Sequence, residues 1–406
     1  MKLKNFILLI AGIFFNVRID LIGSLYLGEL MFLLVLIFNF KLIGQYLKDI
    51  KPLKIFFSLL LIGVFMLIIT NIINGVDFNA FAKGMANQVF LITTIFGAIV
   101  LFKNNLIGVA YFFLGKAIGN NFFQTYVKDF DNLTLESNNF FDISVAPVVT
   151  PLLIFLSIAF YRKKIFVLAI FILYGGFAIL NEARSVGFVF ILSSVLYTVT
   201  LIRVKINKWK IAIMAGIGIP FVLALYFFLG SRGHLGQTTY WQLNSSKEFS
   251  IFSLVNRSET LVGLIAFKDK FLLGHGSKTS DDKYYKIAKE LNLIESFVKE
   301  RERIPAHSVI VGMGVEAGIL AALPWVYMLF LLYSLFPLIM NNKSKYTIAT
   351  LYFLLISIWS ILFSPFGFAR LHFAVFFAFM VIYLLDANPY TIVQVKNRRT
   401  ALKTAF

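Results

Sequence analysis

Residues 304–338 of this chain read IPAHSVIVGMGVEAGILAALPWVYMLFLLYSLFPL, and this stretch largely determines the fold class. A polar loop ends at Pro305, His307 and Ser308 follow, and an apolar run then continues to residue 338 with Glu316 as its one charged side chain. An apolar run of this length predicts a membrane-spanning helix. Polar groups are costly at such a place and usually have a function, and histidine exchanges a proton near neutral pH. The stretch therefore predicts a membrane protein with a candidate proton acceptor where a span begins.

The composition of the whole chain agrees with this prediction. Of its 406 residues 59% are hydrophobic and 14% are charged, and the mean hydropathy is +0.83. A soluble core cannot bury that much apolar surface, so we expect an all-α polytopic membrane protein with residues 1–406 forming a single integral membrane domain. We expect about twelve transmembrane helices, the first retained rather than cleaved. The predicted spans lie near residues 5–17, 21–40, 55–73, 87–102, 106–122, 143–161, 165–181, 185–202, 211–229, 308–338, 347–363 and 369–385.

The charged residues predict the orientation of the chain. Its formal net charge is +18, but the Lys and Arg residues fall in short clusters between the apolar runs. This pattern is typical of cytoplasmic loops, so we expect both termini to be cytoplasmic and no nucleic-acid partner. One large loop, about residues 230–306, is then periplasmic and precedes the helix that follows His307. Lys and Glu alternate with apolar residues over residues 280–303, which predicts short surface helices within this loop.

Three arginines map to the same outer face as His307 on this topology. Arg184 and Arg370 lie at outer helix ends, and Arg257 lies in the large loop. Guanidinium groups match phosphate oxygens and stay charged, so the set predicts a site for a diphosphate. Arg184 could instead anchor its helix at the interface or pair with Glu182, and Arg257 could be a solvated loop charge. No group of Asp or His residues has metal-ligand spacing, so we expect neither a metal nor another cofactor.

Four further residues are candidates for the substrate site together with Arg370. Ser308 could cap the helix, in which case its neighbour His307 could simply bond to the backbone there. Glu316 could orient a positive group or tie two helices together. Gly274 and Gly276 mark a tight turn within residues 271–277.

At these residues the chain resembles the O-antigen ligase and polymerase superfamily of bacterial membrane glycosyltransferases. His307-Ser308, then residues 309–317, then Gly318 resemble the His motif of the family, although Ala321 stands where the family often has Gly, Thr or Tyr. Residues 183–187, around Arg184, and Arg257 with the turn after it resemble the two arginine motifs, although the turn lacks the proline of the family. The resemblance in layout covers nearly the whole chain.

The resemblance implies a metal-independent, inverting glycosyltransferase of the bacterial inner membrane, with its active site facing the periplasm. The donor would be an oligosaccharide on undecaprenyl diphosphate. His307 would take the proton from an acceptor hydroxyl as general base, and Arg184 and Arg257 would hold the diphosphate. This chemistry agrees with the interpretation of His307 as a proton acceptor and of the arginines as a diphosphate site, because a diphosphate leaves readily once its charge is neutralised.

Two activities of the family share this donor and differ in the acceptor. A polymerase extends a second lipid-linked repeat unit, whereas a ligase transfers the glycan to lipid A-core. Residues 304–308, 315–320 and 362–366 look more like the polymerases, for which a regulator of chain length is an expected partner besides membrane lipids. A flippase or other transporter is a weaker alternative, because the polar groups gather at one face and Glu29 and Lys116 are the main charges within the inner spans.

Overall fold

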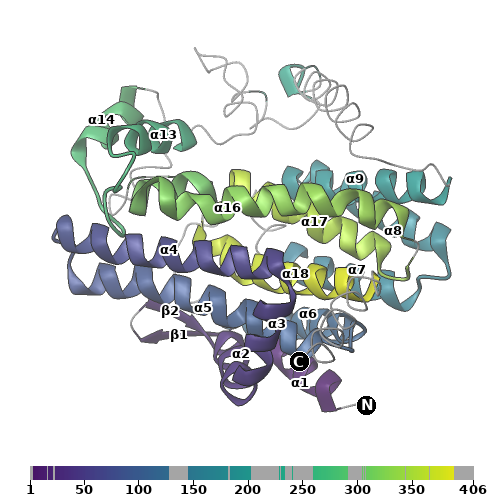
Figure 1. Cartoon of the computed structure of the whole chain (residues 1–406). Coiled ribbons are helices and arrows are strands. Elements are labelled where there is room, and N and C mark those ends of the chain that lie inside the picture. Colours follow the sequence, from purple (N-terminus) through teal and green to yellow (C-terminus); the bar gives the residue numbers. More distant parts are fainter. Residues whose placement is uncertain are drawn as a thin grey trace.

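The computed structural model describes most of the chain, and the secondary-structure elements of the described part are all helices apart from one small β-hairpin, which confirms the expected all-α class. The described residues are 3–15, 17–21, 23–127, 145–181, 183–202, 228, 230–233, 240, 259–290, 304, 306, 308–342, 344–364 and 366–387. Figure 1 shows α4, α5 and α16 running alongside one another, with α13 and α14 forming a separate lobe above one end.

Every predicted span that falls on described residues contains a helix, whereas nearly all of the predicted span 211–229 lies outside them. The helices are α1 (Leu3–Ile13), α2 (Leu27–Phe38), α3 (Phe40–Asp49), α4 (Lys51–Ile73), α5 (Phe78–Phe102), α6 (Gly108–Val127), α7 (Ala146–Ala159), α8 (Lys164–Leu180), α9 (Arg184–Leu201), α13 (Glu259–Asp269), α14 (Asp282–Glu290), α16 (Val309–Asn341), α17 (Thr347–Phe363) and α18 (Phe366–Ala387).

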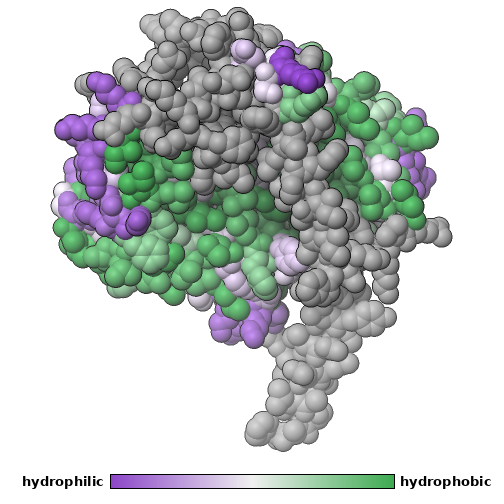
Figure 2. Space-filling view, turned by 90° about the horizontal axis from the view of Figure 1, so that it is seen from above, coloured by the Kyte–Doolittle hydropathy of each residue, from purple (hydrophilic) through white to green (hydrophobic). Residues whose placement is uncertain are grey.

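Within the described residues, α4, α5 and α16 are each long and apolar enough to cross a bilayer. The pair α2 and α3 also passes this test together, but α3 is bent by 82° from α2. Several other helices are apolar but shorter, among them α1, α7, α8 and α17. Seen from above, apolar side chains cover a broad part of the surface and hydrophilic ones gather towards its margins (Figure 2). These features are those of a membrane protein.

One element differs from the prediction near the N-terminus. Strands β1 (Arg18–Leu21) and β2 (Gly23–Tyr26) form an antiparallel hairpin, with Arg18 opposite Tyr26. The predicted span at 21–40 therefore begins as a strand, and its helix starts only at Leu27. Polar and apolar residues alternate only over residues 18–21, and apolar segments lie on both sides. The short strand pattern is therefore hidden within a longer apolar region.

Close helix packing depends on small residues. A Cβ added at Gly115 or Gly119 of α6 would lie 2.1 or 2.0 Å from a backbone oxygen of α1. On α4, Gly63 faces Ala321 of α16, whose Cα would lie 3.4 Å from such a Cβ. Small residues let helix backbones approach in a membrane, where burial of apolar surface drives association only weakly.

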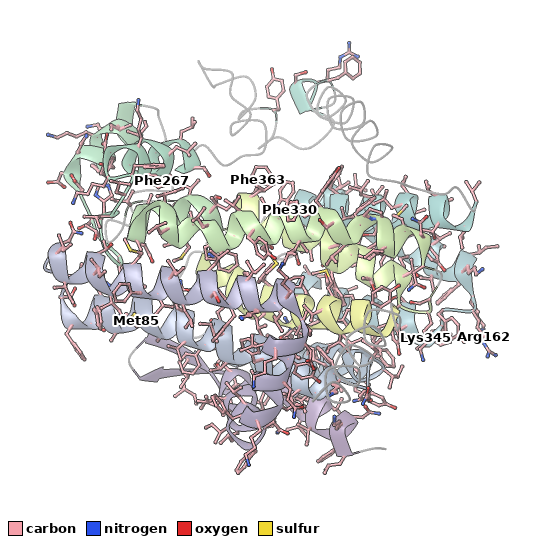
Figure 3. The ribbon with its side chains drawn as sticks, viewed as in Figure 1. Met85, Arg162, Phe267, Phe330, Lys345 and Phe363 are labelled. Carbon is pink, nitrogen blue, oxygen red and sulfur yellow. The ribbon has the colours of Figure 1, made fainter. Side chains whose placement is uncertain are left out.

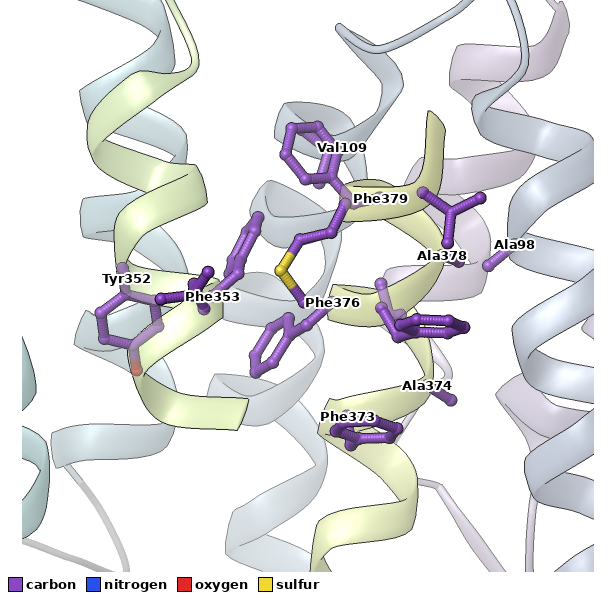
Figure 4. Close-up of a cluster of buried hydrophobic side chains, with 14 of the residues drawn as sticks. Ala98, Val109, Tyr352, Phe353, Phe373, Ala374, Phe376, Ala378 and Phe379 are labelled. Atoms are coloured by element: carbon purple, nitrogen blue, oxygen red, sulfur yellow. The ribbon is translucent and has the colours of Figure 1, made fainter. Parts of the chain in front are cut away.

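Aromatic rings fill the centre of the bundle. Phe353 of α17 stacks on Phe376 of α18 with a centroid distance of 4.6 Å (Figure 4). Phe113 of α6 lies 5.3 Å from Phe353. All three are buried. Such rings contribute both contact area and pair geometry, so they fix how α17 and α18 lie against α6.

The two ends of the bundle differ in character. Figure 3 places Arg162 and Lys345 towards one end of the long helices and Met85 and Phe267 towards the other. Arg162 lies between α7 and α8, and Lys345 lies between α16 and α17. Phe267 belongs to the lobe formed by α13 and α14, so the lobe and these two basic loops lie at opposite ends.

Candidate functional site

The helix that follows His307 is interrupted. Ala317 (φ −142°, ψ 18°) and Gly318 (φ 77°, ψ −175°) have non-helical backbone angles inside α16. We call these two residues the α16 break. As one piece the helix of 33 residues would be roughly 50 Å long, whereas residues 319–341 extend roughly 35 Å and match the roughly 30 Å hydrocarbon core. The predicted span 308–338 is therefore corrected: a short helical segment, residues 309–316, precedes the part that is long enough to span.

A glycine-rich turn docks onto the α16 break. In this turn, residues 271–277 and called the Gly274 turn below, the N–H groups of His275 and Gly276 donate to the carbonyls of Val315 (2.7 Å) and Glu316 (3.0 Å). In return the N–H of Ile319 donates to the carbonyl of Phe271 (2.9 Å). A helix interruption leaves backbone groups without helical partners, and in lipid such groups must find other partners. The turn supplies these partners.

Glycine is required on both sides of this contact. Gly318 has φ +77°, and a Cβ there would lie 2.0 Å from the carbonyl oxygen of Leu272. Gly274 has φ +72°, and a Cβ there would lie 2.6 Å from the backbone nitrogen of Ala317. Positive φ and backbone-to-backbone approach both exclude other residues. The predicted turn at Gly274 and Gly276 is thus confirmed. The structure also explains why residue 318 is glycine, which its place in the sequence did not reveal.

The N–H groups of the two turn glycines already have partners. Gly274 donates to the carbonyl of Lys270 (2.8 Å) and Gly276 donates to Glu316. If these glycines belong to a substrate site, they act by fixing the position of the turn, because their N–H groups are not available to bind a substrate. Glu316 itself lies directly before the α16 break with a half-buried side chain, at the place where turn and helix meet.

The end of α4 holds the same turn from a second side, a contact that is not among the predictions from the sequence. Asn71 accepts a hydrogen bond from the N–H of Ser277 (2.7 Å) and donates to the Ser277 hydroxyl (3.0 Å). The Thr70 hydroxyl donates to the carbonyl of Leu273, and Lys270 donates to Asn74 at 2.7 Å. The available signal was the polar run at residues 70, 71 and 74 at the end of an otherwise apolar span.

Residues 309–316 lie between two hydrophobic cores. Val309 and Met313 are buried in the main core of the bundle, whereas Val311 and Val315 belong to a second core with Val262 and others. Residues four apart share one face of a helix, so the two pairs point to different sides. We define the outer lobe as α13, α14 and the Gly274 turn. The segment that follows His307 is thus packed between the outer lobe and the bundle.

A polar group inside the outer lobe orders the turn further. The buried ring of His275 donates from Nε2 to the carbonyl of Ala266 (2.9 Å), and the hydroxyl of Tyr284 donates to Asp269 (2.8 Å) beside it. Burial lowers the pKa of the His275 imidazole, which favours the neutral ring. Hydrogen bonds from Lys283 and Tyr284 lower the pKa of the Asp269 carboxyl. The arrangement joins α13, the Gly274 turn and α14.

The backbone on both sides of His307 is anchored, although His307 itself lies outside the described residues. On one side the N–H of Ile304 donates to the carbonyl of Thr279 (2.9 Å). On the other, Ser308 is the N-cap of α16, accepting from Val311 at 3.4 Å, which confirms the predicted cap. The Ser308 hydroxyl also donates to the carbonyl of Ile361 near the end of α17 (3.2 Å).

The arginines are placed only by their backbones or not at all. Arg184 is the first residue of α9, and Arg370 lies in the second turn of α18, which follows closely on the end of α17. The bond from Ser308 to Ile361 therefore brings the start of α16 to the junction that leads to Arg370. Arg257 and Glu182 lie outside the described residues, so the predicted arginine set stays a prediction.

Comparison with known proteins adds no relative from which a function could be carried over. No family model, no curated protein and no solved structure matches the chain.

Proposed function

We propose that this chain is a polymerase of an O-antigen-like surface polysaccharide, a membrane glycosyltransferase with His307 as its general base. In this proposal about twelve helices cross the bacterial inner membrane, both termini are cytoplasmic, and residues 230–306 face the periplasm. The basic loops at Arg162 and Lys345 lie at the end of the bundle away from Phe267, which supports this orientation (Figure 3).

The reaction needs no group from outside the donor, the acceptor and the chain. A hydroxyl of the acceptor repeat unit attacks the anomeric carbon of the donor glycan, and His307 takes the proton of that hydroxyl. The bond between the anomeric carbon and the diphosphate breaks, and undecaprenyl diphosphate leaves with the electron pair. Arg184 and Arg257, with Arg370, balance the charge of the diphosphate as it leaves. Attack from the side opposite the leaving group inverts the anomeric centre.

The observation that carries this proposal is the anchoring of the chain around His307. Ile304 is hydrogen-bonded to Thr279, Ser308 caps α16, and the next segment lies between the two hydrophobic cores. A general base is effective when its position is set before the substrate arrives, because the attacking hydroxyl must be held in line with the bond that breaks. Two fixed points, three residues before and one residue after His307, support such a role.

The test is an assay with purified protein in detergent and one synthetic lipid-linked repeat unit, with products separated on a gel. A ladder of multimers supports a polymerase. Transfer that appears only after lipid A-core is added would instead identify a ligase, and product from neither acceptor would reject transferase activity with these substrates. Retention of the anomeric configuration in a defined product would exclude the direct displacement.

Two variants test the residue roles. His307→Ala should reduce the turnover number by a factor on the order of 10²–10⁴ while leaving the thermal unfolding temperature unchanged. A variant with full activity would exclude His307 as the general base. Arg184→Lys should lose most activity, because an ammonium does not reproduce the guanidinium fork, whereas Arg162→Lys at the other end of the bundle should be neutral.

A further inference from the structure

A basic hollow lies where α3 meets α4, far from the candidate site in the sequence. It is lined by Lys48, Lys51, Lys54, Ile55, Ser58 and Leu59, and its volume is about 520 Å³. Lys48 is in the last turn of α3, and Lys51 and Lys54 are in the first turns of α4. The three ammonium groups thus come from both sides of one helix junction. Neither the proposed reaction nor any residue assigned to it uses this hollow.

The helix α3 has the form of a helix that lies in a membrane surface. Its buried residues are Ile43 and Tyr46, while Lys41 and Lys48 are exposed. It is bent by 82° from the apolar helix α2, and Figure 1 shows it lying crosswise to α4. The chain around the bend is strongly apolar and exposed, with Phe38 at 83% and Phe40 at 73% relative exposure. An amphipathic helix with exposed phenylalanines and lysines is typical of the interface between lipid tails and headgroups.

Contacts with other helices hold α3 in this place. The ammonium of Lys103, directly after α5, lies 4.7 Å from the centre of the Tyr46 ring. The ammonium of Lys4 in α1 donates to the carbonyl of Lys103 at 3.4 Å. Helices α1, α3, α4 and α5 therefore meet at this corner, and their lysines gather there. The lysines near the junction of α3 and α4 therefore stand on helices that are packed in place, unlike lysines on an unanchored loop.

The order of groups along the hollow matches the order of groups along a phospholipid. Lys48 ends α3, Lys51 and Lys54 stand at the start of α4, Ser58 follows Lys54 by one turn, and Ile55 and Leu59 are the apolar lining residues. Exposed apolar side chains continue along α4 at Leu61, Ile62 and Phe65. Ammonium groups suit phosphate, a hydroxyl suits the glycerol backbone, and the apolar side of α4 suits an acyl chain.

We propose that this hollow is a binding site for an anionic glycerophospholipid, such as phosphatidylglycerol. The three lysines bind the headgroup phosphate and the acyl chains lie along α4. The site is independent of the proposed glycosyltransferase activity. It fixes the depth of the α2–α3 bend in the bilayer, because a bound headgroup holds the lysine end of α4 at the level of the lipid phosphates.

The test is native mass spectrometry of the full-length protein in detergent, titrated with phosphatidylglycerol or with phosphatidylcholine. The chain should retain phosphatidylglycerol in preference to phosphatidylcholine. The triple variant Lys48→Ala, Lys51→Ala, Lys54→Ala should bind phosphatidylglycerol roughly tenfold or more weakly, since each basic residue near anionic lipid contributes to the attraction. A triple arginine variant at the same positions keeps the charges and should keep the binding.

The matched control removes the same charge elsewhere. Arg162→Ala, Lys163→Ala, Lys164→Ala changes three exposed basic residues where α7 is connected to α8, and this variant should bind phosphatidylglycerol like the unmodified protein. Equal loss in both alanine variants would mean bulk charge attraction and would overturn the site. Equal retention of the two lipids would also overturn it. Displacement of the lipid by millimolar inorganic phosphate alone would reassign the hollow to a free anion.

Discussion

Replacing Gly318 by alanine should release the Gly274 turn from α16. The added Cβ would lie 2.0 Å from the carbonyl oxygen of Leu272, whereas ordinary contact begins near 3.4 Å, so the two backbones must separate by about 1.4 Å. A shift of this size breaks at least two of the three hydrogen bonds between the turn and the α16 break, which are 2.7 to 3.0 Å long. The substitution therefore acts on the docking of the turn and not on the helix alone.

The expected magnitude follows from these contacts. Alanine with the backbone angles of Gly318 (φ 77°, ψ −175°), a region populated almost only by glycine, costs at least about 1 kcal/mol, and each lost backbone hydrogen bond costs about 1 kcal/mol net. Loss of two of the three bonds brings the sum to about 3 kcal/mol, which corresponds to roughly a hundredfold increase in the population of the undocked turn. The amides of His275, Gly276 and Ile319 should then exchange hydrogen roughly a hundredfold faster, because their protection depends on these bonds.

Hydrogen exchange measured by mass spectrometry is the assay, with peptides covering residues 259–290 and 309–325. Gly176→Ala is the matched control, since no atom lies within 4 Å of a Cβ at that helical glycine; its exchange should be unchanged. Gly274→Ala should reproduce the effect of Gly318→Ala from the other side of the contact. Unchanged protection of the turn in a folded Gly318→Ala protein would refute the docking geometry.

Three further predictions concern other contacts. Acidification from pH 8 to pH 5 should make the outer lobe more susceptible to limited proteolysis. Burial lowers the pKa of His275 in the folded state below the unfolded value of about 6.5. The neutral ring therefore stabilises the folded lobe above about pH 6.5, and this stabilisation is lost as the pH falls through the lowered pKa. Asn71→Ala should weaken the docking of the turn by about 1–3 kcal/mol, seen as faster amide exchange at Ser277, because both hydrogen bonds to that residue are lost. Gly119→Ala should lower the unfolding temperature in detergent, because the added Cβ would lie 2.0 Å from a carbonyl oxygen of α1, whereas Gly176→Ala should not.

The regular part of the fold could be predicted from the sequence because apolar length alone specifies it. Each described predicted span contains a helix, and the Ser308 cap and the turn at Gly274 and Gly276 follow from local residue preferences. These features depend on residues close together in the chain. The bend between α2 and α3 could not be predicted, because apolar residues continue through it and the faces of α3 are distinguished only by the burial of Ile43 and Tyr46 against other helices.

The α16 break could not be predicted because its cause lies elsewhere in the chain. Gly318 stands in an apolar run where a glycine is tolerated within a helix, and nothing next to it requires positive φ. The requirement comes from Leu272 and Gly274, more than forty residues earlier, and from the end of α4. The grouping of the three arginines likewise depends on parts of the chain that are far apart in the sequence. Their order in the sequence suggests a common site, but only side-chain positions could establish it.

The position of the α16 break separates two kinds of membrane protein. Transporters use interrupted helices near the middle of the bilayer, where the freed backbone groups bind the substrate. Here roughly 35 Å of continuous helix follows Gly318, so the interruption lies at one edge of the span, and its carbonyls at Val315 and Glu316 accept from the Gly274 turn. An interruption at the edge with its backbone groups occupied does not open a path through the bilayer. It builds a fixed platform at one edge of the span, which begins at Ser308, the residue that follows His307 in the sequence. This favours surface chemistry on a lipid-linked substrate over movement of a solute across the membrane.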